Sequence, residues 1–169
     1  FTYVGTSDLD AVKAAFKPNT KAVYIETPTN PMMEITDIRA LCALAHERNA
    51  LVIIDNTFLS PYFQKPLTLG ADIVVHSGTK FIGGHHDVIS GFTIVKDDEL
   101  AAKLRLTYKT VGACLSAMDS WLVIRGVKTL ALRMEQHQKN AIALAEWLKT
   151  QPKVTKVSVS YTHLTLPTN

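Results

Sequence analysis

Residues 50–55, Ala-Leu-Val-Ile-Ile-Asp, decide the fold, because five apolar residues in a row stop abruptly at a carboxylate. An apolar run without polar alternation predicts a strand that is buried on both faces, as in a parallel sheet covered by helices. Further runs rich in β-branched and aromatic residues predict three more strands, at residues 21–27, 73–75 and 92–95.

Helical patterns accompany these strands. Residues 8–16 predict a first helix. Between the strands at 21–27 and 50–54, apolar residues recur at three- and four-residue spacing, which predicts a helix with Thr36 as its N-cap and an end near Asn49. The alternation of strand and helix predicts an α/β fold with right-handed crossovers.

From Asp97 the pattern is helical to Lys149, with a second helix beginning near Ser116 and a point at Gly126 where it can break. Because the chain starts at Phe1, almost directly with a helix, we expect it to be an interior piece of a longer protein. We expect the sheet within residues 1–115, and long helices in 116–157 that lead toward a missing C-terminal domain. The stretch 158–169 continues no earlier pattern, and we expect it to be a non-native tail.

Composition excludes several classes of protein. With 47% apolar and 20% charged residues, the 169-residue chain has the balance of a globular domain. Its net charge of +3 is scattered, without the basic stripe of nucleic-acid binders. The apolar runs are far shorter than the roughly 20 residues that span a bilayer. Two cysteines are too few for a disulfide framework and favour a reducing, cytoplasmic setting.

Polar side chains follow the predicted strands at their carboxyl ends, where open parallel sheets bind ligands. Asn30 follows the first strand and Asp55 the second, while Ser77 and Lys80 follow the third. A carboxylate and a lysine at neighbouring strand ends indicate either a ligand between them or a direct ion pair. From spacing alone, a non-catalytic binding module with a structural Asp55–Lys80 salt bridge therefore stays open.

Glycines gather around Lys80. Glycine lets the backbone approach a ligand closely, and the hydroxyls of Ser77 and Thr79 could help this segment hold a phosphate. The spacing matches neither a P-loop nor the dinucleotide motif G-x-G-x-x-G. The segment contains four of the eight glycines of the chain: Gly78, Gly83, Gly84 and Gly91.

Other chemistries have little support. The segment 85–87, His-His-Asp, has neither cysteine partners nor an H-E-x-x-H frame, so we predict a hydrogen-bonded loop and no metal site. No serine lies in a G-x-S-x-G elbow. We expect Cys42 and Cys114 to be buried, inert thiols. Arg125 and Arg133 are expected to be surface or interdomain partners.

Several blocks, in order, resemble the Cys/Met-metabolism enzymes that use pyridoxal 5′-phosphate (PLP). They are residues 26–31 (Glu-Thr-Pro-Thr-Asn-Pro), 54–57 (Ile-Asp-Asn-Thr), 76–87 (His-Ser-Gly-Thr-Lys-Phe-Ile-Gly-Gly-His-His-Asp) and, within 119–133, Asp-Ser-Trp-Leu, Arg-Gly-Val-Lys-Thr-Leu and a final Arg. The resemblance runs from about residue 8 to residue 157. Position 78, commonly alanine in the family, is Gly78 here, and position 86, often Ser or Asn, is His86.

The resemblance implies the large domain of a fold-type-I PLP transferase: three layers, with a mostly parallel sheet and helices on both faces, here incomplete. It implies that Lys80 forms a Schiff base with the cofactor and then moves protons, while Asp55 pairs with the pyridine nitrogen. Ser77 and Thr79 would bind the phosphate. Asn30 would bind near the phenolic oxygen of the ring or the substrate carboxylate.

The implied function is an enzyme of trans-sulfuration that makes or cleaves a carbon–sulfur bond at the β- or γ-carbon of an amino acid. Cystathionine γ-synthase or cystathionine lyase chemistry is favoured, with methionine γ-lyase and O-acylhomoserine sulfhydrylase as alternatives. The resemblance also implies a homotetramer, with further site residues outside this chain. We therefore expect the 169-residue piece alone to be inactive.

Overall fold

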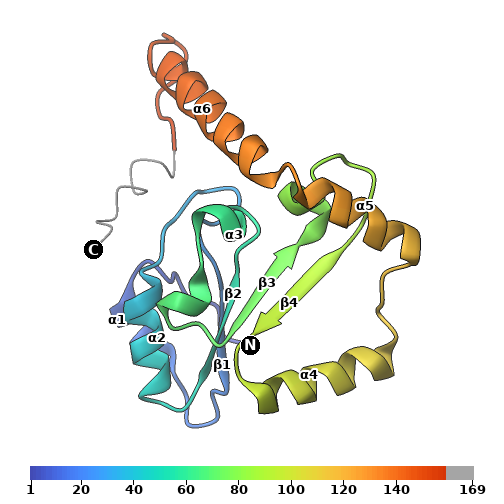
Figure 1. Cartoon of the computed structure of the whole chain (residues 1–169). Coiled ribbons are helices and arrows are strands. Elements are labelled where there is room, and N and C mark those ends of the chain that lie inside the picture. The colour runs from blue at the N-terminus through green and yellow to red at the C-terminus, as the bar shows by residue number, and fades with distance from the viewer. Residues whose placement is uncertain (159–169) are drawn as a thin grey trace.

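The computed structural model describes residues 1–158, whose arrangement is shown in Figure 1. Within these residues four strands form one open sheet, in the order of the sequence: β1 (Ala22–Glu26), β2 (Leu51–Asp55), β3 (Ile73–Ser77) and β4 (Gly91–Val95). The first three strands are parallel, and β4 runs antiparallel to β3. The predicted mostly parallel sheet is therefore confirmed, with strand ends one or two residues from those expected.

Two helices cover one face of this sheet. They are α1 (Leu9–Ala15) and α2 (Ile38–His46), and their apolar sides join the inward residues of β1, β2 and β3 in one core. The largest contributions come from side chains that are almost completely buried: Val12, Ile25, Leu41, Val52, Ile54 and Val74. This core is what holds the strand ends in a fixed register.

The opposite face of the sheet is less covered. Leu51 is 39% exposed and Tyr24 is 60% exposed, whereas Val52 and Ile54 are fully buried. The prediction that residues 50–54 are buried on both faces is therefore wrong for the described residues. The reason is that α1 and α2, which form one of the two expected helical layers, pack on the face of Val52 and Ile54.

The N-cap of α2 is Asp37, whose side chain accepts a hydrogen bond from Ala40 N at 3.0 Å. The prediction of Thr36 as N-cap is therefore wrong. Thr36 is buried, and its hydroxyl lies 2.7 Å from the hydroxyl of Thr6. That contact uses the Thr36 side chain to hold the N-terminal segment, so the next residue caps the helix.

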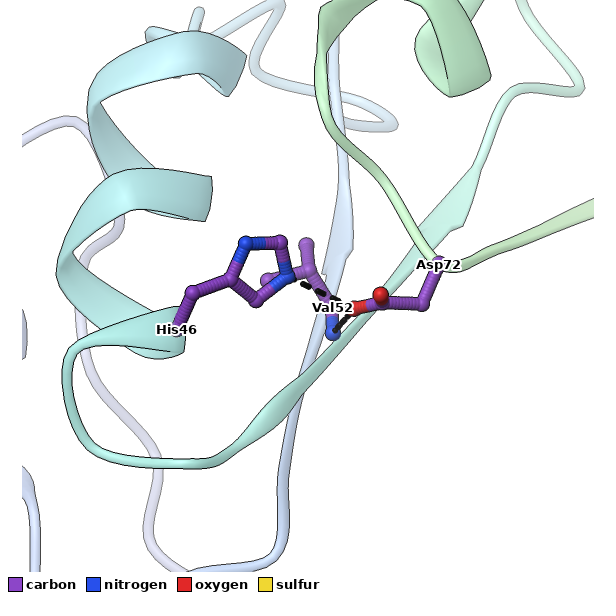
Figure 2. A network of polar contacts seen from close by, with 3 residues as sticks. All are labelled: His46, Val52 and Asp72. Atoms are coloured by element: carbon purple, nitrogen blue, oxygen red, sulfur yellow. Dashed lines mark hydrogen bonds and ion pairs between the residues drawn. The ribbon is translucent and has the colours of Figure 1, made fainter. Parts of the chain in front are cut away.

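A polar network joins the end of α2 to two strands (Figure 2). Asp72 Oδ2, just before β3, accepts a hydrogen bond from Val52 N at 2.7 Å and lies 2.9 Å from His46 Nε2. In return, Asp72 N donates to Val52 O at 3.0 Å. One carboxylate therefore ties α2, β2 and β3 together at the edge opposite to the carboxyl ends of the strands.

Short helical turns follow β2 and β3. They are the one-turn helix α3 (Ser60–Phe63), the 3₁₀ turn η1 (Pro66–Leu69) and the π-helical turn η2 (Gly78–Ile82). The turn η2 begins directly where β3 ends, so it carries Lys80 at the carboxyl edge of the sheet.

The remaining helices are α4 (Asp98–Val111), α5 (Ala117–Val127) and α6 (Leu130–Lys149). Ser116 caps α5 by accepting a hydrogen bond from Asp119 N at 3.0 Å, and the break after Gly126 is present, as predicted. The first turns of α6 pack on α3 and η2, and the helix then leads away from the sheet (Figure 1). Of the suspected tail 158–169, residues 159–169 lie outside the described residues.

Candidate active site

The five predicted site residues line one cavity at the carboxyl ends of the strands. It has a volume of about 1140 Å³, and its lining includes Asn30, Asp55, Ser77, Thr79 and Lys80. They come from the loop after β1, from the ends of β2 and β3, and from η2. The cavity opens on the face of the sheet that α1 and α2 do not cover.

Strand register explains why the side chains converge. Asp55 pairs in register with Glu26 on β1 and with Val75 on β3. Side chains alternate along a strand, so Ser77, two residues after Val75, points to the same face as Asp55. Three neighbouring strand ends therefore present polar groups on one face, a placement that follows directly from the parallel register.

Asp55 is held by two hydrogen-bond donors. Its Oδ1 accepts from Thr57 N at 2.9 Å, and its Oδ2 accepts from the hydroxyl of Tyr24 at 3.3 Å. Partial burial of the phenol, followed by the negative charge of Asp55, raises the pKa of Tyr24, so the phenol stays protonated and keeps donating. The carboxylate is thus oriented by β1 and by its own loop.

Lys80 has no such partners. Its side chain is exposed, and its amine forms no hydrogen bond or ion pair with any of residues 1–158. Its backbone (φ −89°, ψ −121°) leaves the helical region inside η2. The alternative of a structural Asp55–Lys80 salt bridge is therefore wrong: both groups line the cavity, but they are not paired with each other.

The two hydroxyl residues differ in what they offer a ligand. Ser77 N donates to Thr57 Oγ1 at 2.8 Å, while the Ser77 hydroxyl itself bonds to nothing in the described chain. The Thr79 hydroxyl donates to Ser90 O at 3.2 Å and accepts from Ser90 N at 3.0 Å. Ser77 is thus available as a donor, whereas Thr79 closes the loop between η2 and β4.

Asn30 lies in the loop after β1, where its backbone N donates to Glu26 Oε2 at 3.2 Å. Glu26 also lines the cavity, and this contact orients the loop that presents Asn30. The peptide bonds Thr27–Pro28 and Asn30–Pro31 are cis. Asn30 is exposed and lines the cavity.

Three residues that shape the site were not singled out from the sequence for that role. Thr57 supports both Asp55 and Ser77, and its place two residues after the strand-ending carboxylate is a signal that could have found it. Tyr24 is read from the sequence only as a strand residue. Arg133, expected as a surface or interdomain partner, lines the cavity and bonds to backbone of the Lys80 loop 52 residues away, which no local pattern reveals.

The segment 85–87 forms a hydrogen-bonded loop, in which His85 Nδ1 lies 2.8 Å from Gly83 O. His86 and Asp87 line the cavity. Within residues 1–158, no three His, Cys, Asp or Glu side chains come together as a metal site would require. Over the same residues, none of the helices combines the length and the apolar character needed to cross a membrane.

The two thiols differ. Cys42 is buried in the core at 3% exposure, and burial raises its pKa to about 11, as expected for an inert thiol. Cys114 is exposed, so the prediction that it is buried is wrong. It lies in the linker after Gly112, which ends α4 in a left-handed conformation (φ +74°) and turns the chain away from the helix.

The sequence matches the family model described as Cys/Met metabolism PLP-dependent enzyme over residues 1–167. Among curated proteins it is 52% identical to a cystathionine gamma-synthase of Haemophilus influenzae over 155 residues, covering 92% of this chain and 42% of the relative. It is 50% identical to a cystathionine beta-lyase of Lactococcus lactis over 157 residues, covering 93% and 41%. The chain thus spans about two fifths of the length of these relatives.

Solved structures lead to the same family. A cystathionine gamma-lyase from Lactobacillus plantarum, complexed with L-serine, superposes with a TM-score of 0.94 at 48% identity, over 97% of this chain and 45% of that one. A structure of metB from Corynebacterium glutamicum gives a TM-score of 0.91, also at 48% identity, over 93% and 41%. The sheet and helices described above are therefore part of a fold-type-I domain, and the chain belongs to the family of Cys/Met metabolism PLP-dependent enzymes.

Proposed function

We propose that this chain carries the lysine and the ring-binding carboxylate of a PLP-dependent enzyme that makes or cleaves the carbon–sulfur bond of cystathionine. The observation that carries this proposal is the shared cavity, in which two donors hold the Asp55 carboxylate and the Lys80 amine has no partner among residues 1–158. An oriented carboxylate can pair with a cationic ring, and an amine can condense with an aldehyde, so the two groups suit a ligand that contains both.

The donor set fits PLP. The cofactor needs an amine for covalent attachment, an anion beside its ring nitrogen and donors for its phosphate. Lys80, Asp55 and the hydroxyl of Ser77 are of these three kinds, and all line one cavity. At about 1140 Å³ the cavity has room for a cofactor together with an amino acid, since small-molecule sites commonly occupy about 300–1,000 Å³.

When bound, PLP supplies an electron sink for the charge that develops at the substrate α-carbon. We propose that Lys80 Nζ holds the cofactor and then takes and returns the α-proton. Asp55 keeps the ring nitrogen protonated, which maintains the sink. Ser77 donates to the phosphate, and Asn30 donates near the phenolic oxygen or to the substrate carboxylate. Thr79 can join the phosphate site only by giving up its bond to Ser90.

The relatives differ in whether their names describe the synthesis or the cleavage of cystathionine. Proteins about equally similar to this chain include a cystathionine gamma-synthase (52%), a cystathionine beta-lyase (50%) and a cystathionine gamma-lyase of Bacillus subtilis (50%). Cystathionine is common to these names, which supports it as product or substrate here. A relative named cystathionine gamma-synthase/O-acetylhomoserine (thiol)-lyase, 48% identical, keeps sulfhydrylase chemistry as the second candidate.

We further propose that α5 and α6 lead to an additional domain, and that the full-length protein works as a cytoplasmic homo-oligomer. The large apolar side chains that α5 and α6 leave exposed, Trp121 and Trp147 among them, support burial against other parts of the assembly. The two thiols form no disulfide with each other, which suits a reducing compartment.

The full-length protein tests the proposal. Borohydride reduction followed by peptide mass mapping should leave a pyridoxyl group on the peptide that contains Lys80, and Lys80→Arg should abolish it. Asp55→Asn should retain the adduct but lose about 100-fold or more in kcat, because a neutral amide no longer stabilises the charged ring. An adduct on another lysine, or none, contradicts the proposal.

The reaction itself is assigned by three assays run side by side. The substrates are cystathionine, O-acylhomoserine with cysteine, and O-acylhomoserine with sulfide. Product in the first assay indicates a lyase, product in the second a synthase, and product only in the third the sulfhydrylase alternative. Methionine serves as a fourth substrate, because its cleavage would identify a methionine γ-lyase.

A further inference from the structure

One arginine of α6 holds the loop that carries Lys80. Arg133 donates from Nη1 to Phe81 O at 2.6 Å, and from Nη2 to Gly126 O at 2.9 Å. A longer contact, 3.5 Å, joins Nη2 to Ile82 O. Because Phe81 directly follows Lys80, the guanidinium is bonded to backbone one residue away from the amine-bearing position.

Two glycines, Gly84 and Gly126, let the Lys80 loop pack against Arg133 and α5 without side chains between them. A Cβ on Gly84 would lie 2.2 Å from Arg133 Nη1, and a Cβ on Gly126 would lie 2.2 Å from Gly83 O. The loop backbone therefore packs directly on α5 on one side and on the guanidinium on the other. Gly84 also needs its positive φ of +74°, which other residues rarely adopt.

The backbone around Lys80 is fixed at both ends. On the N-terminal side, Thr79 bonds to Ser90 through both its backbone N and its hydroxyl. On the C-terminal side, Lys80 O accepts from Gly84 N at 2.8 Å, and Gly84 abuts Arg133. The Lys80 side chain bonds to nothing in the described chain, so its backbone alone sets the direction of its amine.

We propose that Arg133 is a positioning residue for Lys80, which clamps the backbone of residues 81–84 and thereby aims the amine into the cavity. The inference rests on the proposed function of Lys80. Arginine suits this task because its planar fork can reach several carbonyls at once, whereas the ammonium of a lysine is a point donor on a flexible stem. A catalytic group displaced by about 1 Å can lose about 100-fold in rate.

The first test uses hydrogen exchange on the full-length protein, which measures the loop without depending on turnover. Arg133→Met should raise amide exchange in residues 81–84 about tenfold or more, with much smaller changes in β1 and β2. Arg125→Met is the matched control. Arg125 lies on α5, is exposed and contacts the Trp121 ring at 5.8 Å without a hydrogen bond to the loop. It should leave loop exchange unchanged.

Kinetics on the same variants separates positioning from stability. We expect Arg133→Met to lower kcat about 10- to 100-fold with KM changed less than about threefold, and Arg133→Lys to recover little of the loss. Arg125→Met should stay within about twofold of the wild type. Unchanged kcat and loop exchange in a folded Arg133→Met would overturn the inference, as would full recovery by lysine or exchange raised evenly over the domain.

Gly84→Ala should push the Arg133 guanidinium away from the loop while leaving the arginine itself in the chain. It should reproduce the loop-exchange and kcat effects of Arg133→Met, and adding it to Arg133→Met should cost less than the product of the two single losses, because both disrupt one contact. Fully multiplicative losses would overturn the inference. A wild-type protein without a pyridoxyl group on Lys80 contradicts the proposed function instead, so the two failures are distinguishable.

Discussion

Gly78, the first residue of η2, lies where a larger residue has no room. A Cβ there would lie 2.3 Å from Ser90 Oγ and 2.5 Å from Phe92 Cε2. Ser90 Oγ is itself buried without a hydrogen-bond partner in the described residues. Ser90 and Phe92 therefore occupy the volume that an alanine side chain would need.

Gly78→Ala should accordingly lower the free energy of unfolding by about 1–3 kcal/mol, the usual cost of overpacking. Urea unfolding of the full-length protein measures it, and Gly5→Ala, where a Cβ would meet nothing within 4 Å, is the control. Ser90→Ala in the Gly78→Ala background should recover part of the loss by removing the nearest atom. Equal stability of the Gly78→Ala and Gly5→Ala proteins would show that the site has room after all.

Cys42 gives a prediction on pH. Burial raises its pKa from 9.0 to about 11, so the neutral thiol is favoured by the fold. Because the folded pKa lies above the unfolded one, this contribution to stability is complete below about pH 9 and is lost as pH rises toward 11.

The native full-length protein at pH 8 should therefore leave Cys42 unlabelled by iodoacetamide, while denaturation exposes it. Between pH 9 and 11, the urea midpoint should fall more steeply in the wild type than in Cys42→Ala. Rapid native labelling, or equal slopes for the two proteins, would contradict the predicted pKa.

At the scale of elements, Asp72 is the residue through which α2, β2 and β3 are joined (Figure 2). Its carboxylate accepts from Val52 N at 2.7 Å, and Val52 is fully buried. His46, the other partner, is 44% exposed on its side chain, where ion pairs contribute little. The hydrogen bond from Val52 N to Asp72 is thus expected to contribute more to stability than the contact with His46.

Asp72→Ala should lower the free energy of unfolding by about 1–3 kcal/mol, because it leaves a buried N–H without its acceptor. His46→Ala should cost less than about 1 kcal/mol. Urea unfolding of the full-length protein compares them. A larger loss for His46→Ala than for Asp72→Ala would show that the ion pair, and not the backbone bond, carries the network.

At the scale of the whole molecule, the second half of the chain leaves much apolar surface uncovered. Leu132 is 75% exposed and Val111 71% exposed, and Trp121 and Trp147 are each more than half exposed. Patches of this kind on a soluble domain are normally interfaces.

The 169-residue chain expressed alone should therefore bind the dye ANS strongly, self-associate in size-exclusion chromatography and show no turnover of cystathionine. The full-length protein, in which we expect these surfaces to be buried, is the control and should bind little dye. A well-dispersed isolated chain with measurable turnover would contradict this expectation.

The sequence predicted the strands and most helix boundaries, and the five site residues that it predicted all line the cavity. This was feasible because the ends of parallel strands are marked locally: an apolar run stops, and the next polar residue lies at the edge of the sheet. The two ends of α5 were also marked locally, its start by the capping Ser116 and its end by Gly126.

What the sequence by itself determined is the order of strands and helices and the identity of the polar groups at the strand ends, since these depend on near neighbours in the chain. Only the tertiary structure decided which groups are bonded to each other. It turned Thr79 toward Ser90, left Lys80 unpaired with Asp55, exposed Cys114 and brought Arg133 onto the carbonyl of Phe81. Such contacts join residues far apart in the chain, and they depend on packing distances that no local pattern records.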